Sequence, residues 1–90
     1  MIMNEKELEK VLKALANKRR VAILKHLKRV GRASVGDISE AIKLSYKATS
    51  RHLMVLSGAD ILDKEQESLI VFYFVPKTSH PVVSKLISIL

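Results

Sequence analysis

The side chains best suited to recognise a nucleic acid stand together in one short stretch: Tyr46, Lys47, Ser50 and Arg51. At helical spacing they share one face, because apolar or methyl-bearing residues recur at i, i+4 and i+7 on the opposite face: Thr49, Leu53 and Leu56. Arginine and lysine donate hydrogen bonds to guanine edges in the major groove, so Arg51 and Lys47 are the best candidates for base contacts. An ordinary helical hairpin with a solvated polar face would show the same pattern.

These side chains fall in the second of two short helices that we predict between Ser34 and Leu56. Ser34 can cap the first helix, with Asp37 three residues on, and Ser45 can cap the second. The first helix has an apolar face made by Val35, Ile38, Ala41 and Ile42. Two helices joined by a tight turn, the second with a basic face, are typical of the helix-turn-helix that places a helix in the DNA major groove.

Further cations are candidates for phosphate contacts, which would position the protein on DNA without carrying sequence information. They are Lys18, Arg19, Arg20, Arg32 and Lys43. Thr49 and His52 are also near enough to the expected groove face to contact the DNA backbone. A half-packed position suits His52 equally well.

The positive charge of the chain is concentrated in its first half. Of the formal net charge of +7, the stretch from Lys10 to Arg51 carries +10, with 12 lysines and arginines against Asp37 and Glu40. Residues 1–9 sum to −2 and residues 52–90 to −1. Such a block attracts polyanions with a salt-dependent affinity. Solubility, or the lysine-rich usage of a heat-adapted proteome, would explain a high net charge but not its uneven distribution.

Composition excludes several classes of protein. The 90 residues are enough for one small domain and include no cysteine, which removes thiolate metal sites, redox switching and a cysteine nucleophile. No catalytic triad order, carboxylate pair or phosphate-binding glycine loop stands out, so we expect neither an enzyme nor a cofactor. His26, His52 and His80 have no metal-ligand spacing. Without an apolar run of about 20 residues or a signal-peptide order at the start, we expect a soluble cytoplasmic protein associated with the nucleoid.

Two helices are predicted before the helix-turn-helix and a hairpin after it. Asn4 can cap the first helix, Asn17 interrupts before the second, and Gly31 suits the end of the second. Two β-prone runs, residues 61–65 and 69–75, flank a polar loop at residues 66–68 and predict a hairpin, the wing. The second run is apolar on both faces, so we expect it to be covered on both sides.

A last helix, with Ser79 and Pro81 in its first turn, completes a mainly α fold with a small β-hairpin: four helices, two strands and a helix over residues 1–90. Its apolar stripe and that of the first helix either finish the monomer core or pack on a second copy of the chain. We favour a homodimer, since one small core is already surrounded by four helices and a hairpin. The residues expected in this interface are Leu8, Val11, Leu12, Val82, Val83, Leu86, Ile87 and Leu90.

With its elements placed, the chain resembles the ArsR family of winged helix-turn-helix regulators over nearly its whole length. Residues 12–27, LKALANKRRVAILKHL, resemble the second-helix signature of that family, and Ser50-Arg51-His52-Leu53 resembles a quartet of its helix-turn-helix. The hairpin ending in Phe72-Tyr73-Phe74 resembles the wing strands. The resemblance implies a homodimer built from the first and last helices. It also implies binding to imperfect palindromes on double-stranded DNA, usually as a repressor that a signal releases.

The chain departs from the family pattern where many relatives sense metals. Ser34, Val35, Gly36 and Asp37 stand in the region of the family's cysteines, and the last helix offers only His80 of its Asp and His pairs. We therefore expect no metal site. Asp60 replaces the usual glycine at a helix end but tolerates the left-handed conformation. The wing carries two acids, Glu65 and Glu67, where basic residues are common, so we expect it to add little DNA affinity.

Two other functions stay open at this point. The acidic wing favours a protein-interaction module that keeps the fold without contacting the groove, whereas the basic block and Arg51 oppose this interpretation. A nonspecific chromosomal protein would bind unrelated duplexes with similar affinity. Neither the operator nor a small-molecule effector is indicated by the sequence.

Overall fold

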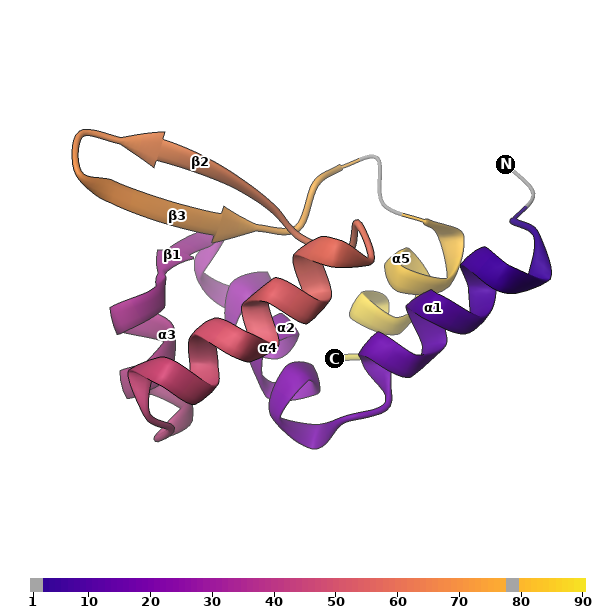
Figure 1. Ribbon diagram of the computed structural model, residues 1–90, viewed down its shortest axis with the longest axis horizontal. Helices are drawn as coiled ribbons and strands as arrows, with labels where there is room; N and C mark the ends of the chain where they lie inside the picture. The colour runs from indigo at the N-terminus through magenta and orange to yellow at the C-terminus, as the bar shows by residue number, and fades with distance from the viewer. Residues whose placement is uncertain (1–2, 78–79) are drawn as a thin grey trace.

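The computed structural model describes residues 3–77 and 80–90, so Ser79, predicted in the last helix, lies outside the described residues. The elements follow in the order α1 (Glu5–Leu15), α2 (Lys18–Val30), β1 (Arg32–Ser34), α3 (Val35–Ile42), α4 (Tyr46–Gly58), β2 (Asp63–Glu67), β3 (Ile70–Phe74) and α5 (Pro81–Ser88) (Figure 1). The predicted mainly α architecture with a hairpin is confirmed. The short strand β1 is added to it.

Local capping sets the helix ends where the sequence predicts them. Side-chain oxygens of Asn4, Asn17, Ser34 and Ser45 accept hydrogen bonds from backbone N–H groups in the first turns of α1, α2, α3 and α4, over 2.8 to 3.2 Å. Gly31 ends α2 with a φ of 89°, a conformation that glycine adopts without steric cost. Asp60 adopts the left-handed conformation with a φ of 58°, as predicted.

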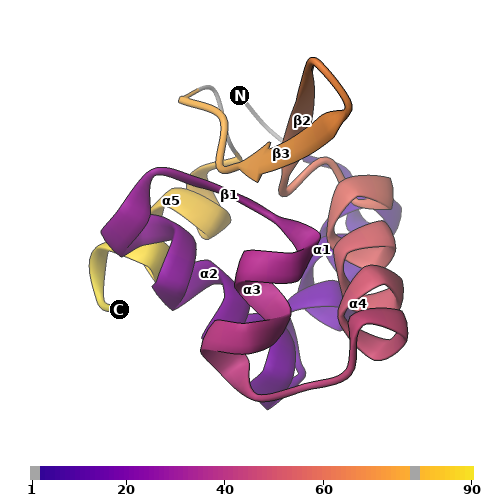
Figure 2. The same cartoon turned by 90° about the vertical axis from the view of Figure 1, so that its left-hand side faces the viewer.

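The three strands form one antiparallel sheet in the order β1-β3-β2, so the last strand in sequence is central (Figure 2). Ala33 pairs with Tyr73, and Tyr73 pairs with Lys64. Side chains alternate between the two faces, and the face with Ala33, Val71 and Tyr73 packs on the helical core. The opposite face is not covered by another element: Ile70 is 50% exposed, and β2 is exposed throughout. The prediction that β3 is covered on both sides is therefore wrong.

The hairpin starts two residues later than predicted, because Ile61 and Leu62 belong to the core rather than to β2. The turn is Ser68-Leu69, with Ser68 in the left-handed conformation at a φ of 59°. Leu69 is 93% exposed at the tip of the wing.

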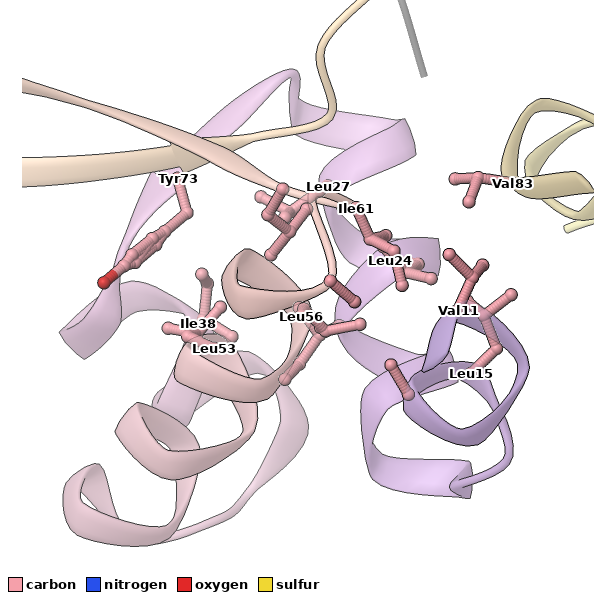
Figure 3. Packing of buried hydrophobic residues seen from close by; sticks show 14 of the residues in the cluster. Val11, Leu15, Leu24, Leu27, Ile38, Leu53, Leu56, Ile61, Tyr73 and Val83 are labelled. Carbon is pink, nitrogen blue, oxygen red and sulfur yellow. The ribbon is translucent and has the colours of Figure 1, made fainter. Parts of the chain in front are cut away.

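The core gathers side chains from the helices, Tyr73 of the central strand and the loop after α4 (Figure 3). Its fully buried hydrophobic members include Ile23, Leu24, Ile38, Leu53, Leu56 and Ile61. Val11 of α1 and Val83 of α5 are also in this cluster, 2% and 0% exposed, so their predicted place in a dimer interface is wrong. Periodicity identified both as apolar-face residues but could not say which surface covers that face. None of the described helices has the length and apolar character needed to cross a membrane.

Candidate nucleic-acid interface

The turn between α3 and α4 fixes how α4 is presented. Lys43 adopts the left-handed conformation with a φ of 56°, and the backbone N–H of Leu44 donates to the carbonyl of Ser39 at 3.0 Å. Ser45 then caps α4 by accepting from the N–H of Ala48 at 3.1 Å. Because both helix ends at the turn are hydrogen-bonded, the first turn of α4 is held in place beside α3.

The inner face of α4 is fully buried. Thr49, Leu53 and Leu56 are each 0% exposed and anchor the helix on the core. Burial contradicts the prediction that Thr49 contacts the DNA backbone. Its hydroxyl oxygen is one of two buried side-chain oxygens without a hydrogen-bond partner in the described part of the chain, the other being that of Ser57.

The outer face of α4 carries Tyr46, Lys47, Ser50 and Arg51. Tyr46 is 63% exposed, Lys47 and Arg51 are exposed, and Ser50 is half-buried. Met54, one helical turn further on, is 67% exposed. These side chains form a polar, basic surface on a well-anchored helix, with no acidic residue in α4 itself.

The predicted phosphate contacts separate into two groups. Lys18 and Arg19 at the start of α2 and Lys43 at the turn are exposed, and within the described residues none of them forms an ion pair. Their positions are compatible with phosphate contacts. Arg20 and Arg32 are engaged elsewhere in the protein.

Arg20 ties α1 to α4. Its Nε donates to the carbonyl of Ala14 at 2.5 Å and its Nη2 to that of Lys13 at 3.2 Å, while Nη1 lies 3.3 Å from Nδ1 of His52. The guanidinium therefore caps the end of α1, and its predicted role as a phosphate contact stays a prediction. Burial lowers the pKa of His52, and the positive charges of Arg20 and Arg19 lower it further.

Arg32 is held by the wing. It lies on the exposed face of the sheet, where its Nη1 is 2.6 Å from Glu65 and its Nη2 is 2.9 Å from Glu67. The guanidinium also lies over the ring of Phe72, 4.2 Å from its centroid. The hydrogen bonds that Arg32 donates to Glu65, and then those to Glu67, raise the pKa of Arg32. Two carboxylates thus neutralise this arginine in the free protein, and its phosphate contact stays a prediction.

This cluster could not be predicted from the sequence, because the cluster depends on strand register. Arg32, Phe72 and Glu65 come to one face only when β1 pairs with β3 and β3 with β2. A three-residue strand gives no periodic signal of its own. The two acidic residues of the wing were the one local signal that indicated a nearby cation.

The remaining dimer candidates lie on α1 and at the end of the chain. Leu8 and Leu12 are 36% and 47% exposed and line a shallow groove of about 410 Å³ along α1. Four others are half-buried against the core of their own chain: Val82, Leu86, Ile87 and Leu90. In the described part of the chain, no cluster of three or more histidine, aspartate or glutamate side chains could hold a metal ion.

Comparison with known proteins identifies this arrangement. Residues 17–64, which include α2, β1, α3 and α4, match the family described as "Bacterial regulatory protein, arsR family". The chain belongs to the ArsR family. It is therefore a transcriptional regulator with the winged helix-turn-helix fold, and members of the family are regulators rather than enzymes.

Relatives support this membership in sequence and in structure. The transcriptional activator HlyU of Vibrio cholerae is 37% identical, over 84% of this chain and 76% of that protein. Its structure has a TM-score of 0.82 at 34% identity and covers 99% of this chain and 92% of that one. The homodimeric winged helix-turn-helix DNA-binding domain of Mb0332 from Mycobacterium bovis, a possible ArsR-family regulator, has a TM-score of 0.80 at 26% identity, with 93% and 74% covered.

This ArsR-family chain contains no cysteine, so it has no thiolate side chain. Its helix-turn-helix and its wing also differ from each other in charge. The helix-turn-helix is basic, whereas the wing has two carboxylates that already pair with the nearest arginine.

Proposed function

We propose that this protein is a sequence-specific regulator that binds double-stranded DNA as a homodimer, with α4 as the recognition helix in the major groove. The observation that carries the proposal is the outer face of α4, where Tyr46, Lys47, Ser50 and Arg51 stand on a helix anchored by three fully buried side chains. Arg51 and Lys47 would read base edges, and Ser50 and Tyr46 would complete the surface. Lys18, Arg19 and Lys43 would contact phosphates, and His52 would lie near the DNA backbone.

The homodimer would use α1 and α5. The support is the exposure of Leu8 and Leu12 along α1, together with the homodimeric state given for the Mb0332 domain. Two recognition helices related by a two-fold axis would bind half-sites about 34 Å apart, which predicts an imperfect palindrome. Acting in the cytoplasm on chromosomal DNA, such a dimer would repress transcription when its operator overlaps a promoter. HlyU is named an activator, so the protein could instead activate transcription. Reporter genes with the operator placed either at the promoter or upstream of it decide between repression and activation.

The test is selection of bound duplexes from a random pool at two salt concentrations, followed by affinity measurements on Arg51→Ala. A palindromic consensus is expected, and Arg51→Ala should lower affinity for it by about 1–3 kcal/mol and relax one base position in each half-site. Lys77→Ala, which removes one exposed cation after β3, is the matched control and should keep both affinity and consensus. Sedimentation of the free protein reports the dimer separately.

Enrichment of no consensus, with a steep salt dependence, would contradict the proposal and indicate nonspecific DNA coating. Absence of DNA binding at both salt concentrations would instead favour a protein-interaction module. If Arg51→Ala keeps the wild-type consensus, the base-reading role of Arg51 is wrong.

A further inference from the structure

A groove on the side of α2 is lined by four cations, of which all but Arg19 lie outside the proposed DNA-binding surface. It has a volume of about 530 Å³ and runs between α2, α3 and the last residue of the chain. Its charged lining comes from Arg19, Lys25, Lys28 and Arg29 of α2, with His26 among them. Within the described residues none of these four cations forms an ion pair, and α2 has no acidic residue to balance them.

Helical spacing explains why the charges gather here. Residues three and four apart share a face, so Arg19, Ala22, His26 and Arg29 follow one stripe of α2, with Lys25 beside it. Nη2 of Arg29 lies 3.3 Å from Nδ1 of His26, so the two side chains are in contact at the groove. A cluster of like charges on one helix is unfavourable by itself, and an anion in the groove would relieve it.

The floor of the groove is apolar. The apolar lining residues are Ala22 of α2, Ala41 and Ile42 of α3, and Leu90. Phosphates on a DNA backbone would use the cations but would gain nothing from apolar contacts. A second copy of the chain, docked face to face across a two-fold axis, would place the cations of one copy against the same cations of the other. The combination fits an anion with an apolar body.

We propose that this groove binds a small amphipathic carboxylate, with its apolar chain on Ala22, Ala41 and Ile42 and its carboxylate among Lys25, Lys28 and Arg29. The volume lies within the range of about 300–1,000 Å³ that is usual for small-molecule sites. A medium-chain fatty-acid anion has the right size and shape. The site also joins α2 to the first helix of the helix-turn-helix, so an occupant contacts the element that supports α4.

The first experiment measures binding of decanoate to the protein alone by calorimetry, below the concentration at which decanoate aggregates. One decanoate per chain is expected. Lys25→Ala/Lys28→Ala should weaken binding by about tenfold or more, which corresponds to the loss of a charge-assisted contact. The control Lys6→Ala/Lys77→Ala removes two exposed cations elsewhere and should change the affinity by less than about twofold. Circular dichroism confirms that each variant is folded.

The second experiment tests separately the contact of the carboxylate and the contact of the apolar chain. Decyltrimethylammonium, which has the same chain with a cationic head, should not bind, and decanol should bind more weakly than decanoate. Ala41→Phe on the exposed side of α3 should fill the groove and abolish decanoate binding. In amide NMR spectra, decanoate should shift the signals of Ala22, His26 and Ala41 and leave those of the wing unchanged.

Three outcomes would overturn the proposal. Equal decanoate affinity in the two double variants would show that the cations of the groove do not hold the carboxylate. Equal binding of decyltrimethylammonium would show nonspecific adsorption to apolar surface. No decanoate binding, with DNA affinity lowered only in Lys25→Ala/Lys28→Ala, would make the groove a phosphate-contact surface. Because the primary measurement needs no DNA, its result is independent of the proposed function.

Discussion

Helix α4 and the wing lie in the same half of the domain but are held in different ways (Figure 1). Three fully buried side chains anchor α4, whereas in the hairpin strands only Tyr73 is buried, and β2 is exposed along its whole length. Their electrostatics differ too. Beside α4, Arg20 lies 3.3 Å from His52 and disfavours its protonated form, while Arg32 next to the wing is satisfied by Glu65 and Glu67. Helix α4 is therefore firmly anchored and has positive charge around it that is not paired with carboxylates, whereas the wing has neither property.

This difference indicates how the two parts divide the work on DNA. A base-reading helix must be held to within a fraction of an ångström, which needs buried anchors on its inner face. A wing that has already neutralised its arginine has little charge left to attract phosphates. We therefore expect affinity and specificity to depend on α4, and changes in the wing to act mainly through its charge.

The largest expected effect is the loss of an anchor of α4. Leu53→Ala should lower the free energy of unfolding by about 2–5 kcal/mol, because a fully buried leucine leaves both lost contacts and a cavity. Leu69→Ala at the tip of the wing, where the side chain is 93% exposed, should change it by less than about 0.5 kcal/mol. Urea denaturation of both variants makes the comparison. Similar losses in the two variants would show that the wing is anchored as firmly as α4.

The second effect concerns the charge of the wing. Glu65→Gln/Glu67→Gln removes both carboxylates that hold Arg32, so the double variant should bind the selected operator more tightly. If the freed Arg32 then contacts one phosphate, the slope of log affinity against log salt should become steeper by about 0.9. Stability should change little, because these side chains are 41 to 65% exposed.

A control variant with the same loss of negative charge separates a local effect from net charge. Glu5→Gln/Glu7→Gln alters the first turn of α1, away from the sheet, and should leave the salt slope unchanged. An unchanged slope in the wing variant would mean that Arg32 does not reach DNA even when it is free.

A third variant tests whether the buried side chain of Thr49 contacts DNA. Thr49→Val keeps the shape of the side chain and removes a buried hydroxyl that has no partner within the described residues. Stability should stay equal or rise by up to about 1 kcal/mol, because burying an unpaired polar group is unfavourable. Affinity for the operator should stay within about twofold, since a buried side chain touches no DNA. A marked loss of affinity would restore Thr49 to the interface.

The helices of this fold could be predicted because their signals are local. Asn4, Ser34 and Ser45 cap helices through atoms three residues away, and apolar spacing then identifies each inner face. Strand β1 gave no such signal. Its partners are about 40 residues distant, so the role of Arg32 depended on a register that no short window of sequence contains.

The candidate site could be predicted in part for the same reason. Helical spacing correctly put Tyr46, Lys47 and Arg51 outside and Leu53 inside. Spacing cannot say what covers an apolar face, however, and Val11 and Val83 pack within their own chain. Nor can it show that Arg20 bonds to carbonyls of α1, because that contact depends on the angle between two helices.

The smallest effect uses the one histidine at the α4 side whose pKa is lowered. Burial and the positive charges of Arg20 and Arg19 favour neutral His52 in the folded protein, so the unfolded chain binds the proton more readily. Stability supported by neutral His52 is therefore complete above the ordinary value of about 6.5 and is lost as pH falls through the lowered pKa. His52→Gln removes this dependence and should reduce the drop in Tm between about pH 7.5 and 5.5, measured against wild type. His80→Gln, at the start of α5, is the matched control. If the Tm of His52→Gln falls as much as that of wild type on acidification, the positive charges near His52 do not lower stability at acidic pH. The electrostatic difference between α4 and the paired charges of the wing would then be wrong.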